Sequence, residues 1–247
     1  MSGHSKWSQI KRQKGMTDSK RGQLFTKLGR EIAVAARQGG PDPDANFRLR
    51  LAVQKARENN MPMENIERAI KRAAGTGEGA SLEEGIYEGY GPGGTAIIVE
   101  TLTDNRNRTV SEIRNVFTRG GGNMAEAGAV AWVFESKGAI TIAAGKRNPD
   151  EIALAAIDSG ADDVKIEDDA IEVYTQAQDL EKVRRALEEQ GMQIESAELS
   201  MQPKTTVFLG EKEALQTLRM IERLEELDDV QRVHFNADFD TSILEKD

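Results

Sequence analysis

Basic side chains and one indole ring lie close together around residue 10 of this 247-residue chain. The stretch GHSKWSQIKRQKG, residues 3–15, contains Lys6, Trp7, Lys11, Arg12 and Lys14 and has no acidic residue. Cations that neutralise phosphates release counterions and bind nucleic acid with little regard to its base sequence, and a tryptophan ring can stack on a base. The stretch therefore predicts a nucleic-acid contact. The alternative is a solvated basic helix with Trp7 folded onto its own domain.

The next segment, residues 17–37, continues this basic character on a predicted helix. Leu24, Phe25, Leu28 and Ile32 fall on one side of a 3.6-residue period, which is typical of an amphipathic helix with a polar outer face. The basic residues of this helix extend the predicted contact; they are Lys20, Arg21, Lys27 and Arg30.

A second predicted anion site lies in the loop TDNRNRT, residues 103–109. The loop joins a predicted strand to a predicted helix, so Arg106 and Arg108 would lie beside the N–H groups of a helix N-terminus, where anions bind favourably. The alternative is a solvated loop in which Asp104 and Asn105 make turn hydrogen bonds.

Residues suited to catalysis or to metal binding are few. The chain has no cysteine, and its histidines, His4 and His234, belong to no zinc-protease or hydrolase motif. The acidic pairs at 162–163, 168–169 and 228–229 fall at predicted turns, where we expect them to be solvated. We therefore predict no catalytic residue, no metal site, no cofactor and no enzymatic activity.

The segment EGYGPGG, residues 88–94, matches the glycine pattern of a dinucleotide-binding loop. In such a loop the glycines follow a strand and open a helix, whereas here they precede a predicted strand and include Pro92. We interpret the segment as a structural turn.

Charge is distributed unevenly along the chain. Residues 1–79 contain 16 lysines and arginines and 8 acidic residues, a net charge of +8, whereas residues 80–247 contain 17 and 34, a net charge of −17. A basic module joined to an acidic body indicates that the module meets phosphates.

Three helices are predicted in the basic part: residues 17–37, residues 44–58, and a segment from Pro62 to Gly75. The glycine-rich segment 75–85 is interpreted as a linker. Extended segments at 95–104 and 129–135 flank a helix at 109–121, and a last β-α-β unit covers 205–235. Residues 138–200 form a β-α-β-β-α-β series by themselves.

These elements predict a multidomain α+β fold. An N-terminal three-helix domain, residues 1–79, precedes two ferredoxin-like βαββαβ domains, one inserted in the other. The outer domain is discontinuous, residues 80–136 and 201–247, and the inserted domain covers residues 137–200.

Several long strings of the sequence resemble one family closely. They include GHSKW at 3–7, KRGQLFTKL at 20–28, YEGYGPGGTAIIVETLTDNRNRT at 87–109 and LDDVQRVHFNADF at 227–239. These strings are similar to those of the YebC family, along nearly the whole chain. The resemblance implies a cytoplasmic protein of three domains that acts as a DNA-binding transcriptional regulator, with relatives in mitochondria that activate translation. It brings no catalytic or binding residue that can be transferred to a position here.

The sequence thus predicts a cytoplasmic, non-enzymatic regulator that binds nucleic acid and has no membrane segment. DNA is the leading partner. The alternative is a translational activator or stalling-relief factor that binds ribosomal RNA or the ribosome. A protein–protein adaptor, in which the acidic domains bind a protein partner, is the alternative of another class.

Overall fold

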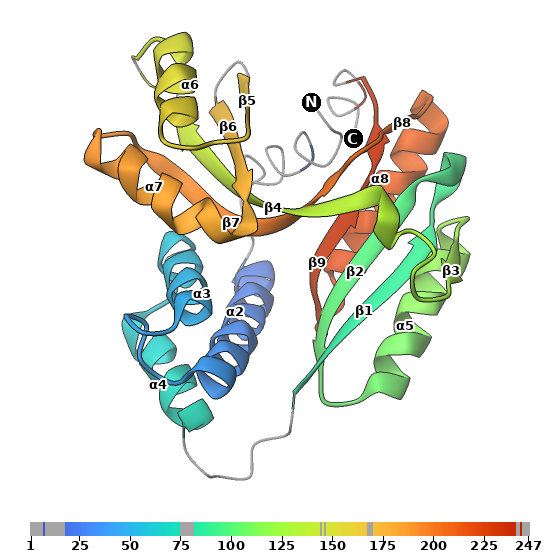
Figure 1. Cartoon of the computed structure of the whole chain (residues 1–247). Coiled ribbons are helices and arrows are strands. Elements are labelled where there is room, and N and C mark those ends of the chain that lie inside the picture. Colours follow the sequence, from blue (N-terminus) through green and yellow to red (C-terminus); the bar gives the residue numbers. More distant parts are fainter. Residues whose placement is uncertain are drawn as a thin grey trace. The chain divides into compact units, whose positions relative to one another are not determined.

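The computed structural model describes residues 7, 18–74, 82–143, 145, 147–166, 170–240 and 243. Its N-terminal part consists of the helices α2 (Asp18–Gly39), α3 (Phe47–Glu58) and α4 (Met63–Ala74) (Figure 1). Their apolar stripes meet in a cluster of their own, which includes Leu28, Ile32, Leu49 and Ile66. The three predicted helices are confirmed.

Asn46 fixes the turn between α2 and α3. Its side-chain oxygen accepts a hydrogen bond from the Leu49 N–H at the start of α3, and its amide nitrogen donates to the carbonyls of Ala35 and Gly40 at the end of α2. One buried side chain therefore satisfies backbone groups at both helix ends.

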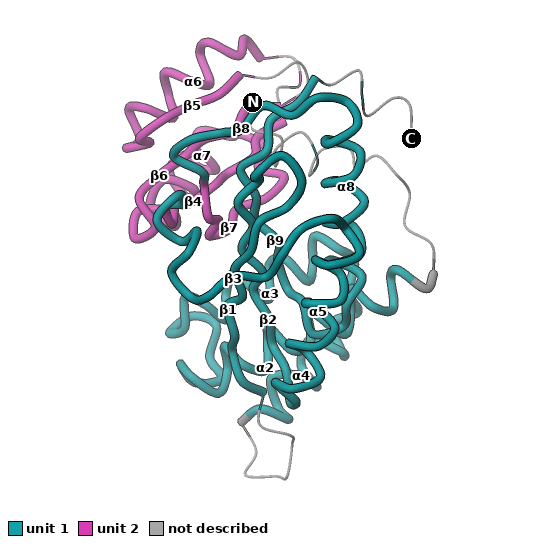
Figure 2. The backbone as a smooth tube through the Cα atoms, turned by 90° about the vertical axis from the view of Figure 1, so that its right-hand side faces the viewer, with its two compact units in different colours: residues 1–134, 203–247 teal, residues 135–202 magenta. Residues whose placement is uncertain are grey.

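The chain forms two compact units, residues 1–134 with 203–247, and residues 135–202 (Figure 2). Besides the helices α2–α4, the first unit holds a four-stranded antiparallel sheet with the order β3-β1-β2-β9. Its strands are β1 (Glu83–Tyr90), β2 (Ala96–Thr103), β3 (Asn123–Ala125) and β9 (Val230–Phe235). The short strands β8 (Val207–Phe208) and β10 (Ala237–Asp238) pair in parallel in a separate ladder.

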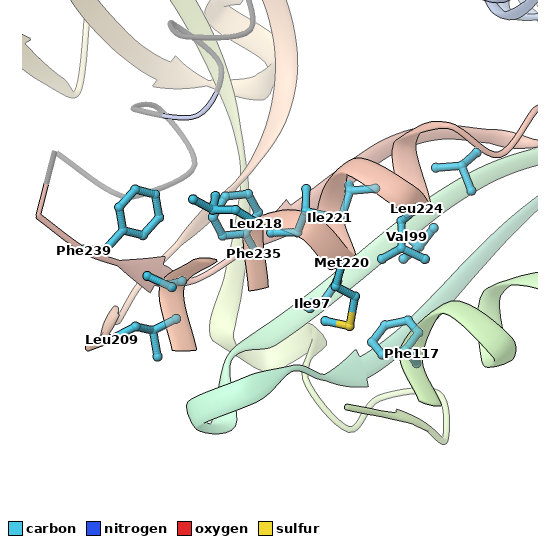
Figure 3. Close-up of a cluster of buried hydrophobic side chains, with 14 of the residues drawn as sticks. Ile97, Val99, Phe117, Leu209, Leu218, Met220, Ile221, Leu224, Phe235 and Phe239 are labelled. Atoms are coloured by element: carbon cyan, nitrogen blue, oxygen red, sulfur yellow. The ribbon is translucent and has the colours of Figure 1, made fainter. Parts of the chain in front are cut away.

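The core of this unit lies between the sheet and the helices α5 (Arg106–Arg119) and α8 (Glu211–Glu225). Ile97 and Val99 of β2 pack in one buried cluster with Phe117 of α5 and with Leu218 and Ile221 of α8 (Figure 3). β2 is a central strand of this sheet. The chain passes from the end of β2 into α5, and from α8 into β9, the neighbour of β2.

The structure differs from the sequence-based expectation at one strand of this sheet and at one predicted strand. The segment 83–90 forms β1, although its glutamates and glycines have low strand propensity. The predicted strand at 129–135 is instead the 3₁₀ turn η2 (Ala131–Val133), followed by β4. Gly89 permits β1 to lie against α5, because a Cβ there would come within 2.5 Å of the Phe117 ring. The later glycines of EGYGPGG lie in the hairpin turn between β1 and β2: Gly91 precedes η1 (Pro92–Gly94), and Gly93 and Gly94 have positive φ.

The second unit consists of β4 (Phe134–Ala143), α6 (Pro149–Asp158), β5 (Asp163–Ile166), β6 (Ala170–Gln176), the 3₁₀ turn η3 (Ala177–Asp179), α7 (Leu180–Glu189) and β7 (Ile194–Pro203). The strand order β5-β6-β4-β7 is that of a ferredoxin-like βαββαβ sheet. The predicted α+β fold class, with three N-terminal helices and an inserted βαββαβ series, is confirmed. None of the described helices is long and apolar enough to cross a membrane.

Candidate nucleic-acid interface

Of the candidate residues in the basic stretch at residues 3–15, the structure describes only Trp7. Lys6, Lys11, Arg12 and Lys14 lie outside the described residues, as does His4. The Trp7 indole N–H donates to Oε2 of Glu225 at 3.2 Å, and its half-buried ring packs against the core between the sheet and α5 and α8. In this structure the ring thus contacts its own chain.

Three cations of α2 contact the acidic end of α8, which we define as residues 222–229, with five acidic residues and one arginine. Lys20 Nζ lies 3.4 Å from a carboxylate oxygen of Glu222 and 3.4 Å from one of Glu226. Lys27 and Arg30 follow seven and ten positions later, which places all three cations along one side of α2.

Lys27 and Arg30 bind backbone carbonyls at this helix end as well. Lys27 Nζ donates to the Glu225 carbonyl at 2.6 Å, and Arg30 Nη1 donates to the Asp228 carbonyl at 2.8 Å. The last carbonyls of a helix have no partner within it and carry its negative dipole end, so cations are favourable there.

The Lys20 ammonium is stabilised in its charged form by these contacts. Burial lowers its pKa, but Glu222 and Glu226 outweigh burial, so the pKa of Lys20 is raised above its ordinary value. Its side chain is still 52% exposed, so the ion pairs are accessible to solvent and to salt.

Asp229, the last residue of the acidic end of α8, is the centre of a buried polar cluster. Its carboxylate, 2% exposed, accepts from the guanidinium of Arg108 at 2.7 and 2.9 Å and from the hydroxyls of Thr103 and Thr109 at 3.1 and 2.8 Å. It also accepts from Arg30 Nη1 at 3.0 Å. Burial raises its pKa, but these hydrogen bonds outweigh burial, and the pKa of Asp229 lies below its ordinary value.

The TDNRNRT loop therefore surrounds an anion that belongs to the chain itself. Asn105 caps α5 by accepting from the Arg108 N–H, and Arg108 binds Asp104 as well as Asp229. The exposed Arg106 pairs with Glu83, at 2.6 Å between Nε and Oε2.

The expectation that the acidic pair at 228–229 is solvated was wrong for Asp229. Asp228 is exposed, as expected at a turn, but Asp229 is buried. The physical reason is the pairing of β2 with β9, which brings the residue before β9 to the end of β2 and the start of α5.

Further polar contacts join the α2–α4 bundle to the sheet. Glu31 of α2 accepts from Arg232 of β9 at 2.6 Å, and Arg48 of α3 pairs with Glu84 of β1. The buried apolar cluster of the bundle and that of the sheet have no member in common. The junction described by these residues is therefore largely polar.

Sequence reasoning missed the cations of α4. Arg68, Lys71 and Arg72 are exposed on this helix, opposite the buried Ile66 and Ala73. Lys71 lies 3.9 Å from Glu67 in an i, i+4 pair. The 3.6-residue periodicity that predicts the buried stripe of α4 also predicts that these cations lie on its exposed face, so the sequence carried the signal. Of the predicted residues, Arg21 is also exposed, on α2.

Two family models match the chain. That of the TACO1/YebC protein N-terminal domain matches residues 5–76, and that of the TACO1/YebC second and third domain matches residues 82–237. The chain belongs to the TACO1/YebC family. Similar members of the TACO1/YebC family occur in Dehalococcoides mccartyi, 58% identical over 246 residues, and in Chloroflexus aggregans, 55% identical over 249 residues.

Both relatives bear the name probable transcriptional regulatory protein, and the alignments cover 100% of this chain and 98% and 99% of theirs. The crystal structure of a conserved hypothetical protein from Aquifex aeolicus is similar as well. It is 47% identical with a TM-score of 0.84, over 90% of this chain and 92% of that one. The TACO1/YebC family fold is thus common to both structures.

Proposed function

We propose that this protein is a non-enzymatic regulator of gene expression that binds nucleic acid through its basic helical part, with DNA as the leading target. The separation of charge carries the proposal: residues 1–79 have a net charge of +8 and residues 80–247 one of −17. The name of the relatives, probable transcriptional regulatory protein, supports the regulatory role.

The cations of the helical part neutralise phosphates, and Trp7 stacks on a base or lies against the sugar–phosphate backbone. The proposed contact residues in the first 30 positions are Lys6, Trp7, Lys11, Arg12, Lys14, Lys20, Arg21, Lys27 and Arg30. The exposed Arg68, Lys71 and Arg72 of α4 add a second cationic face to the same bundle. Arg106 and Arg108 of the loop at 103–109 are the remaining candidates, and each has a carboxylate partner within the chain, as Lys20 and Arg30 do.

RNA is the second candidate target, because contacts of this kind are made to phosphates and do not read base edges. Sedimentation of a cell lysate through a sucrose gradient, with and without nuclease, separates the possibilities. A DNA-binding regulator is released to the top of the gradient by DNase alone, whereas a ribosome-associated factor sediments with the ribosomal subunits and is released by RNase. A protein that stays in the same fractions under both treatments binds a protein partner instead, and the proposal is then wrong.

A further inference from the structure

The acidic end of α8 occupies residues that the proposed function assigns to nucleic acid. Glu222 and Glu226 bind Lys20, Glu225 binds Trp7 through its carboxylate and Lys27 through its carbonyl, and Asp228 and Asp229 bind Arg30. Four of the proposed contact residues therefore meet one short acidic segment of the same chain.

This segment offers the same chemistry as a phosphate backbone. It presents closely spaced anionic oxygens, and the carbonyls at its helix C-terminus add the negative end of the helix dipole. Lysine and arginine donate to carboxylates and to phosphates in similar geometries. A phosphate backbone and the acidic end of α8 cannot occupy the same N–H donors at the same time.

The contact between the cations of α2 and the acidic end of α8 can be broken without unfolding either part. The bundle and the sheet have separate buried apolar clusters, so the contacts of Lys20, Lys27 and Arg30 join two parts that each have a core, whereas the half-buried Trp7 also packs against the core of the sheet. Exposed ion pairs such as those of Lys20 stabilise weakly and are screened by salt.

Asp229 does not need Arg30 to remain satisfied. Its buried carboxylate keeps Arg108, Thr103 and Thr109 as partners within the sheet and α5 when Arg30 leaves. The Glu225 carbonyl, which Lys27 caps, lies at a helix end that water can reach once Lys27 moves away. Opening therefore leaves no buried charge without a partner among these residues.

We propose that the acidic end of α8 is an internal competitor for nucleic acid, which holds Trp7, Lys20, Lys27 and Arg30 until a phosphate backbone displaces it. This inference rests on the proposed function and states how nucleic-acid binding would be regulated. The measured association constant is then the intrinsic association constant multiplied by the fraction of molecules in which the acidic end of α8 has released these residues. A protein partner or a modification that weakens the contact then increases binding without touching the nucleic acid.

The test uses the whole chain with Glu222→Gln and Glu226→Gln together, which removes both carboxylates from Lys20. The matched control is Glu126→Gln with Glu213→Gln, which changes the net charge equally. Glu213 lies nine residues before Glu222 on α8, about 13 Å along its axis, and both control residues are exposed. Binding of a fluorescein-labelled DNA duplex and of a structured RNA hairpin is measured by fluorescence anisotropy at low salt.

We expect the Glu222/Glu226 variant to bind roughly three- to tenfold more tightly than the unmodified protein, the range expected when one or two surface ion pairs are removed. The control changes affinity by less than about twofold, since its charges are remote and screened. Adding Lys20→Gln to the unmodified protein and to the Glu222/Glu226 variant completes a double-mutant cycle. The loss of affinity caused by Lys20→Gln should be larger in the Glu222/Glu226 variant, because Lys20 contacts phosphate more often in that variant.

The outcomes separate the two proposals. If the unmodified protein binds and the two double variants gain equally, the internal competitor is wrong and the proposed function stands. If neither the unmodified protein nor the Glu222/Glu226 variant binds DNA or RNA, both the proposed function and the competitor are overturned.

Discussion

Replacing Asp229 by asparagine should destabilise the first unit by about 2–4 kcal/mol. The side chain keeps its shape but loses the charge that holds the Arg108 guanidinium, the Thr103 and Thr109 hydroxyls and Arg30. A hydrogen bond to a charged group contributes about 1.5–3 kcal/mol, and removing one partner of a buried ion pair costs about 3–5 kcal/mol. The expected cost stays below the upper end of these ranges, because Arg108 is partly exposed and keeps Asp104 as a partner.

Urea denaturation followed by tryptophan fluorescence measures this change. Both tryptophans of the chain, Trp7 and Trp132, belong to the first unit, so the signal reports on the unit that contains Asp229. Asp228→Asn is the matched control: the charge change is the same one residue away, on an exposed side chain, and the free energy of unfolding should change by less than about 0.5 kcal/mol.

The difference between the two proteins should also depend on pH in a defined direction. The folded-state pKa of Asp229 lies below its ordinary value of 3.8. Its contribution to stability is therefore fully present above about pH 4 and is lost as the pH falls through the lower folded-state pKa. Equal stability of the Asp229→Asn and Asp228→Asn proteins at neutral pH would refute the role assigned to this cluster.

Two further predictions concern the strand β1. Gly89→Ala should lower the free energy of unfolding of the first unit by about 1–3 kcal/mol in a urea titration, because the new methyl group meets the Phe117 ring. The control is Gly22→Ala on α2, where the new methyl group lies in open space and should raise the free energy of unfolding by about 0.5–1 kcal/mol. Unchanged stability of the Gly89 variant would contradict the packing of β1 on α5. Glu88→Gln should cost about 1–3 kcal/mol, because the Glu88 carboxylate accepts three backbone N–H groups of the loop at 128–131; a change no larger than that of the exposed Glu126→Gln would show that this loop does not depend on the charge.

The helices of the fold could be predicted from sequence because each has a strong local signal. The apolar stripe of α2, with Leu28 and Ile32, and the proline before α4 are visible in single segments of the chain. β1 has no such signal, because its sequence EEGIYEGY owes its extended form to pairing with β2 and β3 on either side. Tertiary context outweighs propensity there.

The candidate site was predicted in its residue types but not in its partners. The clustering of lysine and arginine before residue 80 is a property of composition, and the sequence shows it directly. That Lys20 and Arg30 would meet acidic residues about 200 positions later depends on how α2 lies against α8, which no local pattern encodes. The pairing of β9 with β2, which joins segments more than 100 positions apart, likewise converts Asp229 from an expected surface residue into a buried one.

The central claim, that the helical part neutralises nucleic-acid phosphates, is tested most directly by two variants of equal charge and different location. The first replaces four cations of the helical part by glutamine: Lys11, Arg12, Lys20 and Lys27. The second replaces four exposed cations of the other domains by glutamine: Arg114, Arg119, Lys182 and Lys212. The binding constant of the whole chain for a DNA duplex is measured by anisotropy across a salt titration.

The slope of log K against log salt is about −0.9 per neutralised phosphate on duplex DNA. We predict that the helical-part variant has a slope shallower by about 0.9 for each phosphate that it no longer neutralises, with weaker binding on every DNA sequence, and that the second variant keeps the slope of the unmodified protein. An unchanged slope in the first variant together with a shallower slope in the second would place the phosphate-binding residues outside the helical part and contradict the claim.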